Sequence, residues 1–286
     1  MARLPLAPTV VATLLLAALA ALAAAVLVVF GGWYDVAADR PHTQLVYSLM
    51  ETTMRASVQR RAAAIEPRPL ADGALGPRGA VCFRDHCVAC HGAPGQAPDA
   101  LARTLQPVPG PLVDAAQHWR TRELVWIVRH GIRMSGMPAW GDRLSDDDIW
   151  ALALFIEQLP TLSPADYAAL QVQQQPLRCD AGAGGIVRAP VGDARLAEAG
   201  REAMQRHACH ACHQIPGVVG SRRWVGPPLA GFAQQQLIAG RLPNTPDNLA
   251  RWIEQPQRVD PGTAMPDLGV GSADARAMAA YLATLR

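Results

Sequence analysis

A five-residue pattern of two cysteines and a histidine occurs twice in this chain and constrains its fold more than any other feature. It reads Cys-Val-Ala-Cys-His at residues 87–91 and Cys-His-Ala-Cys-His at residues 209–213. The same landmarks follow each copy in the same order: Trp126-Ile127, Met137-Pro138 and Phe155 after the first, and Trp252-Ile253, Met265-Pro266 and Tyr281 after the second. The spans from histidine to last aromatic are 64 and 68 residues, and this near-equality indicates an internal repeat.

The spacing within each copy predicts a specific chemistry. Positions i, i+3 and i+4 lie on one face of a helical turn, so two thiols and an imidazole can act on one group. These residues are Cys87, Cys90 and His91 in the first copy and Cys209, Cys212 and His213 in the second. Two thiols that add to vinyl groups beside an iron-ligating histidine are the signature of c-type haem attachment. The sequence therefore predicts two covalently bound haem c groups.

Two other uses of paired cysteines fit the chain less well. A zinc ribbon places its cysteine pairs about 15–20 residues apart, whereas Cys87 and Cys209 are 122 positions apart. A thioredoxin-type pair needs a βαβ pattern, and neither repeat shows a run of alternating strand character. We therefore expect an all-α fold, with Ser145 and Asp148 forming a capping box and Ser272 capping the last helix.

Composition excludes several function classes. The chain has 26 basic and 24 acidic residues, a net charge of +2, and every basic residue is arginine. Without lysine there is no Schiff base and no P-loop lysine. A nucleic-acid partner is not expected, because no basic tract is present. The chemistry must come from cysteine, histidine and methionine.

Residues 9–30 form an uncharged run of 22 residues near the start of the chain. A helix of this length spans about 33 Å, enough to cross a bilayer core of about 30 Å. Ala18-Leu19-Ala20 or Ala21-Leu22-Ala23 could instead serve as a signal-peptide cleavage site, but such apolar regions normally stop at about 15 residues. We expect a retained single-pass anchor. Arg3 before the run places the N-terminus in the cytoplasm, with the remainder exported.

Proline and glycine clusters divide the remainder of the chain. The expected division is 1–33 as transmembrane anchor, 34–75 as membrane-proximal helix and linker, 76–161 as first haem domain, 162–193 as linker and 194–286 as second haem domain. Within the membrane-proximal helix, Leu45, Leu49 and Val58 belong to an apolar stripe. Such a stripe is typical of a packing surface.

The repeat also suggests the sixth iron ligands. After His213 only Met265 and Met278 can serve, and Met278 has core spacing on the last helix, so Met265 is the predicted ligand. The first repeat offers His118, His130, Met134 and Met137. Alignment with Met265-Pro266 selects Met137, while His130 stays the alternative and would give a bis-histidine haem of lower potential.

Taken together, these residues resemble class I c-type cytochromes, and the resemblance covers both repeats. In that family a glycine and an aromatic residue precede the haem motif by eight and four positions, where Gly79 and Phe83 stand before Cys87. In the second repeat Gly200 and Met204 lie nine and five positions ahead of the motif. The resemblance implies two small helical domains, in which these glycines pack against the last helix near Phe155 and Tyr281.

Two further likenesses follow. The family uses a Gly-Pro-x-Leu turn whose proline carbonyl accepts the second N–H of the haem histidine, and residues 226–229 fit this turn. Residues 109–112 do not align cleanly, so the partner of His91 is unassigned. Residues 242–252 and 262–266 are similar to the cytochrome domain fused to subunit II of caa-type oxidases.

Cys82 and Cys179 lie outside the haem motifs. In an oxidising compartment they could form a disulfide, and two separate thiols are an equally open alternative, since sequence does not give connectivity.

The functional hypothesis is a membrane-anchored dihaem c-type cytochrome of the bacterial inner membrane, with its haem domains on the periplasmic side. It would be an electron carrier rather than an enzyme, passing electrons in a respiratory chain to or within a terminal oxidase complex. Two alternatives stay open: a dihaem peroxidase, and the cytochrome subunit of a periplasmic dehydrogenase. A histidine-methionine ligand set favours the carrier, because it leaves the iron no open position.

Overall fold

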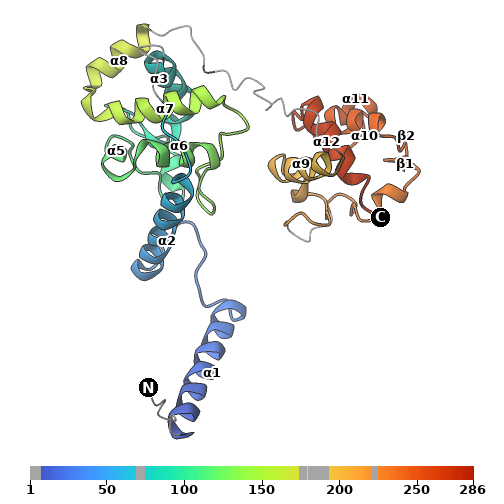
Figure 1. Cartoon of the computed structure of the whole chain (residues 1–286), viewed down its shortest axis with the longest axis horizontal. Coiled ribbons are helices and arrows are strands. Elements are labelled where there is room, and N and C mark those ends of the chain that lie inside the picture. The colour runs from blue at the N-terminus through green and yellow to red at the C-terminus, as the bar shows by residue number, and fades with distance from the viewer. Residues whose placement is uncertain (1–7, 69–74, 174–178, 180–192, 221–224) are drawn as a thin grey trace. The chain divides into compact units, whose positions relative to one another are not determined.

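The structure is a computed structural model that describes residues 8–68, 75–173, 179, 193–220 and 225–286. The chain forms two compact units, with the main division between residues 180 and 181. Both are helical, which confirms the expected all-α class (Figure 1). The first unit contains the helices α1 Pro8–Phe30, α2 Gln44–Ala62, α3 Leu75–His86, α4 Val88–His91, η1 Ala102–Thr104, α5 Ala115–His118, α6 Thr121–His130, α7 Asp146–Gln158, η2 Leu159–Thr161 and α8 Pro164–Gln173.

The second unit is built on the same plan with one small addition. Its elements are α9 Asp193–Arg206, η3 Cys209–Ala211, η4 Phe232–Gln234, β1 Leu237–Ile238, β2 Leu242–Pro243, α10 Pro246–Glu254, α11 Pro256–Val259 and α12 Ser272–Leu282. The two short strands pair antiparallel, with Ile238 opposite Leu242. This ribbon differs from the expected absence of strands, because two residues per strand are too few to show an alternating pattern in the sequence.

The first and last helices of each repeat cross at a glycine. A Cβ atom on Gly79 of α3 would lie 2.8 Å from the Phe155 Cβ on α7, and one on Gly200 of α9 would lie 2.9 Å from the Met278 nitrogen on α12. Both distances are far below van der Waals contact, so only glycine lets the two backbones come this close. The close approach of the first and last helices is confirmed in both units, but the expected aromatic residue lies at the crossing only in the first, because Gly200 lies against Ala277 and Met278 rather than Tyr281.

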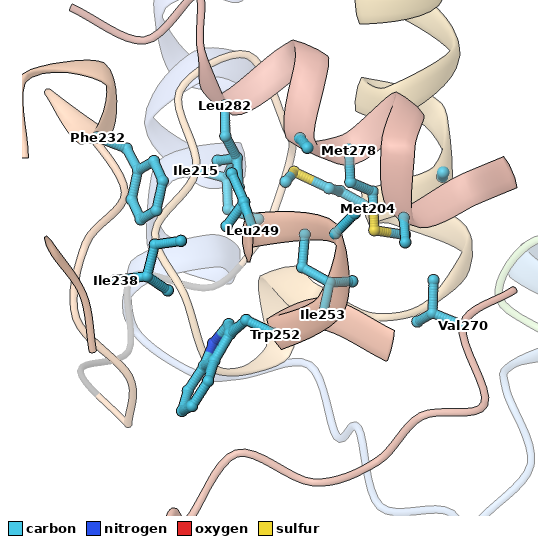
Figure 2. Packing of buried hydrophobic residues seen from close by; sticks show 14 residues of the cluster. Met204, Ile215, Phe232, Ile238, Leu249, Trp252, Ile253, Val270, Met278 and Leu282 are labelled. Atoms are coloured by element: carbon cyan, nitrogen blue, oxygen red, sulfur yellow. The ribbon is translucent and has the colours of Figure 1, made fainter. Parts of the chain in front are cut away.

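The two crossings differ in their side chains. In the first unit the rings of Phe83 and Phe155 pack with centroids 5.4 Å apart. In the second unit Met204 takes the place of the aromatic residue and is buried with Met278 in the core (Figure 2). Tyr281 points to the loop instead and donates a hydrogen bond to the Pro216 carbonyl.

The core of the second unit gathers side chains from every helix of the unit that is longer than one turn. Figure 2 shows its larger members, which are Met204, Ile215, Phe232, Ile238, Leu249, Trp252, Ile253, Val270, Met278 and Leu282. The helix α10 that carries Trp252 begins where the Thr245 hydroxyl accepts a hydrogen bond from the Asn248 nitrogen at 3.3 Å. Pro246 occupies the first helical position, where its missing N–H costs nothing.

The two helix starts predicted from serine residues have different outcomes. Helix α7 begins at Asp146, directly after Ser145, as expected. Helix α12 begins at Ser272 itself, with Gly271 as its N-cap and no side-chain cap hydrogen bond, so the expected Ser272 cap is wrong. The helix starts one residue earlier than the serine signal suggested, which places the hydroxyl inside the first turn.

Helix α1 is long and apolar, with a mean hydropathy of 2.8 over its best window, and its side chains are exposed. Its 23 residues span about 34 Å. By length and composition it could cross a membrane, and a signal sequence can have the same length and composition.

The segments expected as linkers on either side of the first haem domain pack on that unit. On α2, Val58 and Ala62 are buried, and Arg55 lies over the Trp119 ring at 5.1 Å. On α8, the buried Tyr167 ring meets Phe83 edge-on, with centroids 6.3 Å apart.

Cys82 and Cys179 form a disulfide, with Cα atoms 4.7 Å apart. This settles the alternative that the sequence left open. The bond joins the middle of α3 to the chain that follows α8.

Candidate haem sites

The first Cys-x-x-Cys-His motif lies at the end of α3. The Cys87 carbonyl accepts hydrogen bonds from the Cys90 nitrogen at 3.1 Å and the His91 nitrogen at 2.9 Å. These bonds wind the motif into one helical turn, so both thiols and the imidazole share a face. Cys87 and Cys90 are free thiols. Burial, together with the neighbouring Cys90, raises the pKa of Cys87 to about 12, so the group is a neutral thiol at neutral pH.

His91 is oriented by a backbone carbonyl. Its Nδ1 lies 2.7 Å from the Gly110 oxygen. An imidazole that donates through Nδ1 keeps its lone pair on Nε2, where it can ligate iron. Burial lowers the pKa of His91, against the opposite effect of the Gly110 hydrogen bond, and so favours the neutral, ligating form.

Gly110 is the partner of His91 that the sequence left unassigned. The carbonyl acceptor lies 19 residues after the histidine in the first unit and 14 residues after it in the second. Because the two loops differ in length, Gly110 does not align with Pro227 when the two repeats are compared. The sequence feature that marks this turn is the run Pro109-Gly110-Pro111. In it the glycine carbonyl takes the role that the Pro227 carbonyl has in the second unit.

The second motif forms a similar turn after a different approach. The Cys209 carbonyl accepts from the Cys212 nitrogen at 3.3 Å and from the His213 nitrogen at 3.0 Å. Helix α9 ends at Arg206, and Ala208 adopts a left-handed conformation with φ 55°. This turn accommodates the one extra residue between Gly200 and the motif, so the α9–α12 crossing is kept. Burial raises the pKa of the Cys209 thiol as well.

His213 is held by the turn that the family resemblance implied. Its Nδ1 lies 2.7 Å from the Pro227 oxygen, which confirms that expectation. Gly226 lies against the ring, where a Cβ would be 2.8 Å from Nδ1. A cavity of about 320 Å³ opens beside the ring and is lined mainly by apolar residues, including Ile215, Pro216 and Val218.

Both methionine candidates lie in irregular loops with the same local hydrogen bond. The Met137 nitrogen donates to the Ser135 hydroxyl at 3.2 Å, and the Met265 nitrogen donates to the Thr263 hydroxyl at 3.2 Å. Both side chains are half-buried. The Ser/Thr-x-Met-Pro pattern is present in both repeats. The two loops therefore share this backbone turn as well as the sequence pattern.

The competing candidates lie elsewhere. Met134 is 79% exposed, and Met278 is fully buried in the core of the second unit. His130 is exposed at the end of α6, with its ring 4.9 Å from that of Trp126. His118 is exposed on α5 beside Asp114. These surroundings favour the two loop methionines.

The donor set of each unit fits a covalently attached haem. Each has two free thiols in one helical turn, an imidazole anchored through Nδ1 and a thioether in a loop.

Comparison with known proteins agrees with this geometry. Residues 74–156 match the family model described as cytochrome c oxidase, cbb3-type, subunit III, and residues 197–286 match the model described as cytochrome c. Both units are c-type cytochrome domains.

One curated relative is similar to part of this cytochrome. It is cytochrome c oxidase subunit 2 of Alkalihalophilus pseudofirmus, 34% identical over 92 residues, which are 32% of this chain and 26% of the relative. The chain therefore spans about a quarter of the length of the curated relative it matches. No solved structure matches the chain.

Proposed function

We propose that this protein is a membrane-anchored dihaem c-type cytochrome that passes electrons in a respiratory chain to or within a terminal oxidase complex. The observation that carries the proposal is the paired arrangement of the two histidines. His91 and His213 each turn Nδ1 to a backbone carbonyl at 2.7 Å and so keep Nε2 for iron. A chain with two such sites can receive and deliver electrons without substrate chemistry.

Each residue of the donor sets has a role in this proposal. Cys87 and Cys90 in the first unit, and Cys209 and Cys212 in the second, would hold haem through thioether bonds, formed by addition of each thiol S–H across a haem vinyl group. His91 and Met137 would ligate the iron in the first unit, and His213 and Met265 would ligate it in the second. When bound, the haem supplies one-electron chemistry at its iron, which alternates between ferric and ferrous states.

The proposed reaction is the transfer of one electron between two partner proteins. One electron leaves a reduced donor protein, resides on the cytochrome and passes to an oxidised acceptor protein, and no substrate bond is made or broken. A methionine on the iron raises the reduction potential, which suits the late steps of a respiratory chain. The same methionine would leave the iron no open position for a substrate, which favours a carrier over a peroxidase.

Helix α1 supports the placement of this cytochrome at the bacterial inner membrane. Its 23 residues are enough for one crossing. Arg3 lies before the apolar run, and Trp33 and Tyr34 follow it. This order supports an N-terminus in the cytoplasm and haem units in the periplasm. A tether also raises the effective concentration of the haems near membrane partners.

The membrane-proximal half of α2 suggests how a partner is held. Leu45 and Leu49 are 79% and 66% exposed, although the same helix buries Val58 on the first unit. Residues 44–53 contain one acidic and no basic residue, whereas helices that bind lipid surfaces are rich in lysine and arginine. The occupant we propose is an apolar helix of a membrane-embedded oxidase subunit, because only 13 residues separate α2 from the end of α1.

The decisive experiment is an anaerobic optical redox titration of the full chain in mild detergent, with haems counted as the pyridine haemochrome. We expect two c-type haems per chain, both at high potential. Stoichiometric binding of azide or peroxide to one haem would support the peroxidase instead. A single haem per chain would contradict the proposal.

A further inference from the structure

The haem-binding helix of the first unit touches the loop that carries its methionine. His86 is the last residue of α3 and directly precedes Cys87. Its ring lies against that of Trp140, with centroids 4.8 Å apart and planes at 42°. Trp140 follows Met137 by three residues. The contact therefore joins the two chain segments that would lie on opposite sides of a bound haem.

Trp140 is held in place by the backbone in the loop that carries Met137. Its nitrogen donates a hydrogen bond to the Val128 carbonyl on α6 at 3.1 Å. Nearby, the Ile132 nitrogen donates to the Met137 carbonyl at 3.2 Å. The backbone of the loop is thus tied to the end of α6, and the Trp140 ring ties it to α3.

His86 is itself held in place. Its Nε2 lies 3.1 Å from the Cys179 carbonyl oxygen, and the Cys179 nitrogen donates to the Asp85 carboxylate at 2.8 Å. The disulfide fastens Cys179 to Cys82, one turn earlier on α3. The hydrogen-bond acceptor of His86 is therefore anchored to the same helix as His86, which fixes the direction of the ring.

The second unit has no equivalent ring pair at the matching positions. Ala208 precedes its haem motif, and Leu268 follows Met265 by three residues. The two units of one chain therefore differ in this contact, as they also differ in the carbonyl that holds each motif histidine. The second unit provides an internal reference.

We propose that His86 is a positioning residue: through Trp140 it holds the Met137 loop in place, and so keeps the Met137 thioether on the iron of the first haem. This inference rests on the proposed function, since it takes Met137 as a ligand. Loss of a group that orients a metal ligand typically changes metal affinity or activity by about 10- to 100-fold, and His86 would act on Met137 through Trp140 and the backbone of the loop. Loss of the contact should make the thioether easier to displace.

The test is imidazole binding to the oxidised full chain in mild detergent, followed through the methionine-iron charge-transfer band. A Met265→His background closes the second haem to imidazole, so the remaining band reports the first unit. We expect His86→Ala to tighten imidazole binding at least about tenfold, and Trp140→Ala to do the same. Because both remove one contact, the double variant should add little to either.

Two variants separate the parts of the contact. His86→Phe keeps a ring against Trp140 and should retain most of the native resistance to imidazole, while His86→Gln keeps only a side-chain donor and should behave like His86→Ala. His118→Ala, an exposed histidine on α5, is the matched control and should change nothing.

The outcomes are distinct. A His86→Ala variant that loses thermal stability but binds imidazole within about twofold of the parent would overturn the inference and leave His86 a purely structural residue. Absence of the methionine-iron band in the Met265→His background, with His86 intact, would remove the Met137 assignment itself and the inference with it. That second result is visible before any His86 variant is made.

Discussion

The Thr263 hydroxyl accepts a hydrogen bond from the Met265 nitrogen at 3.2 Å, and Ser135 does the same for Met137. A serine or threonine two residues before the donor closes a compact turn in the backbone. The turn sets the direction in which each methionine leaves the chain. The two repeats therefore agree in loop conformation as well as in composition, which supports the same ligand role for both methionines.

Removal of either loop methionine should change one haem alone. We expect Met137→Ala and Met265→Ala each to abolish one methionine-iron band and lower one midpoint potential, because a thioether ligand favours ferrous iron. An optical redox titration measures both quantities. Met134→Ala is the control, since that side chain is exposed, and it should keep both bands. If Met137→Ala alters neither property, His130 becomes the better ligand.

Gly226→Ala should disturb the second haem site. A Cβ at this position would lie 2.8 Å from Nδ1 of His213, so the ring must move away from the Pro227 carbonyl. We expect a loss of about 1–3 kcal/mol in the stability of the second unit and a shifted potential of one haem. Calorimetry and redox titration check these effects. Gly271→Ala, where a Cβ meets open space, should be much milder.

The disulfide should contribute strongly to the first unit. Its two cysteines are 97 residues apart, and cross-linking a loop of this size stabilises a protein by up to about 4–5 kcal/mol in the loop-entropy description. We expect Cys82→Ala/Cys179→Ala to lower the unfolding midpoint of the first unit and to spare the second. Mass analysis without reductant should find the bond in the parent protein, and two free thiols there would contradict it.

Acid should weaken the contact between the ends of α9 and α12. His207 bonds the Asp274 carboxylate at 2.9 Å, and this bond, with the Arg206 charge, holds the pKa of Asp274 below its ordinary value of 3.8. A lowered carboxyl pKa stabilises the folded state above pH 3.8, and this contribution is lost as the pH falls through the lower, folded-state value. Acid unfolding of Asp274→Asn should lack this component, whereas identical pH profiles would refute it.

Charges on the exposed face of α2 should weaken assembly without unfolding the cytochrome. Leu45→Asp/Leu49→Asp should leave both haem spectra intact, because neither side chain packs on the first unit. We expect the ratio of this cytochrome to oxidase haem in detergent-extracted complexes to fall severalfold. Thr53→Asp, on an exposed part of the same helix, is the matched control. An unchanged ratio would argue against this docking face.

The local patterns in the chain were enough to predict much of this cytochrome. The Cys-x-x-Cys-His turns, the uncharged run and the all-α class depend on neighbouring residues, so their spacing is visible in one dimension. The Gly79 and Gly200 crossings and the Pro227 carbonyl followed from family resemblance. The repeat also predicted Met137 and Met265 as iron ligands.

Other features were decided only by tertiary structure. Gly110 became the partner of His91 because the length of the intervening loop brings its carbonyl there. The docking of α2, the Cys82–Cys179 bond and the contact of His86 with Trp140 join residues that lie tens of positions apart. Sequence by itself determined which groups could act on a haem. Packing decided which carbonyl, ring or helix holds each group, because such contacts depend on the path of the whole chain and not on local spacing.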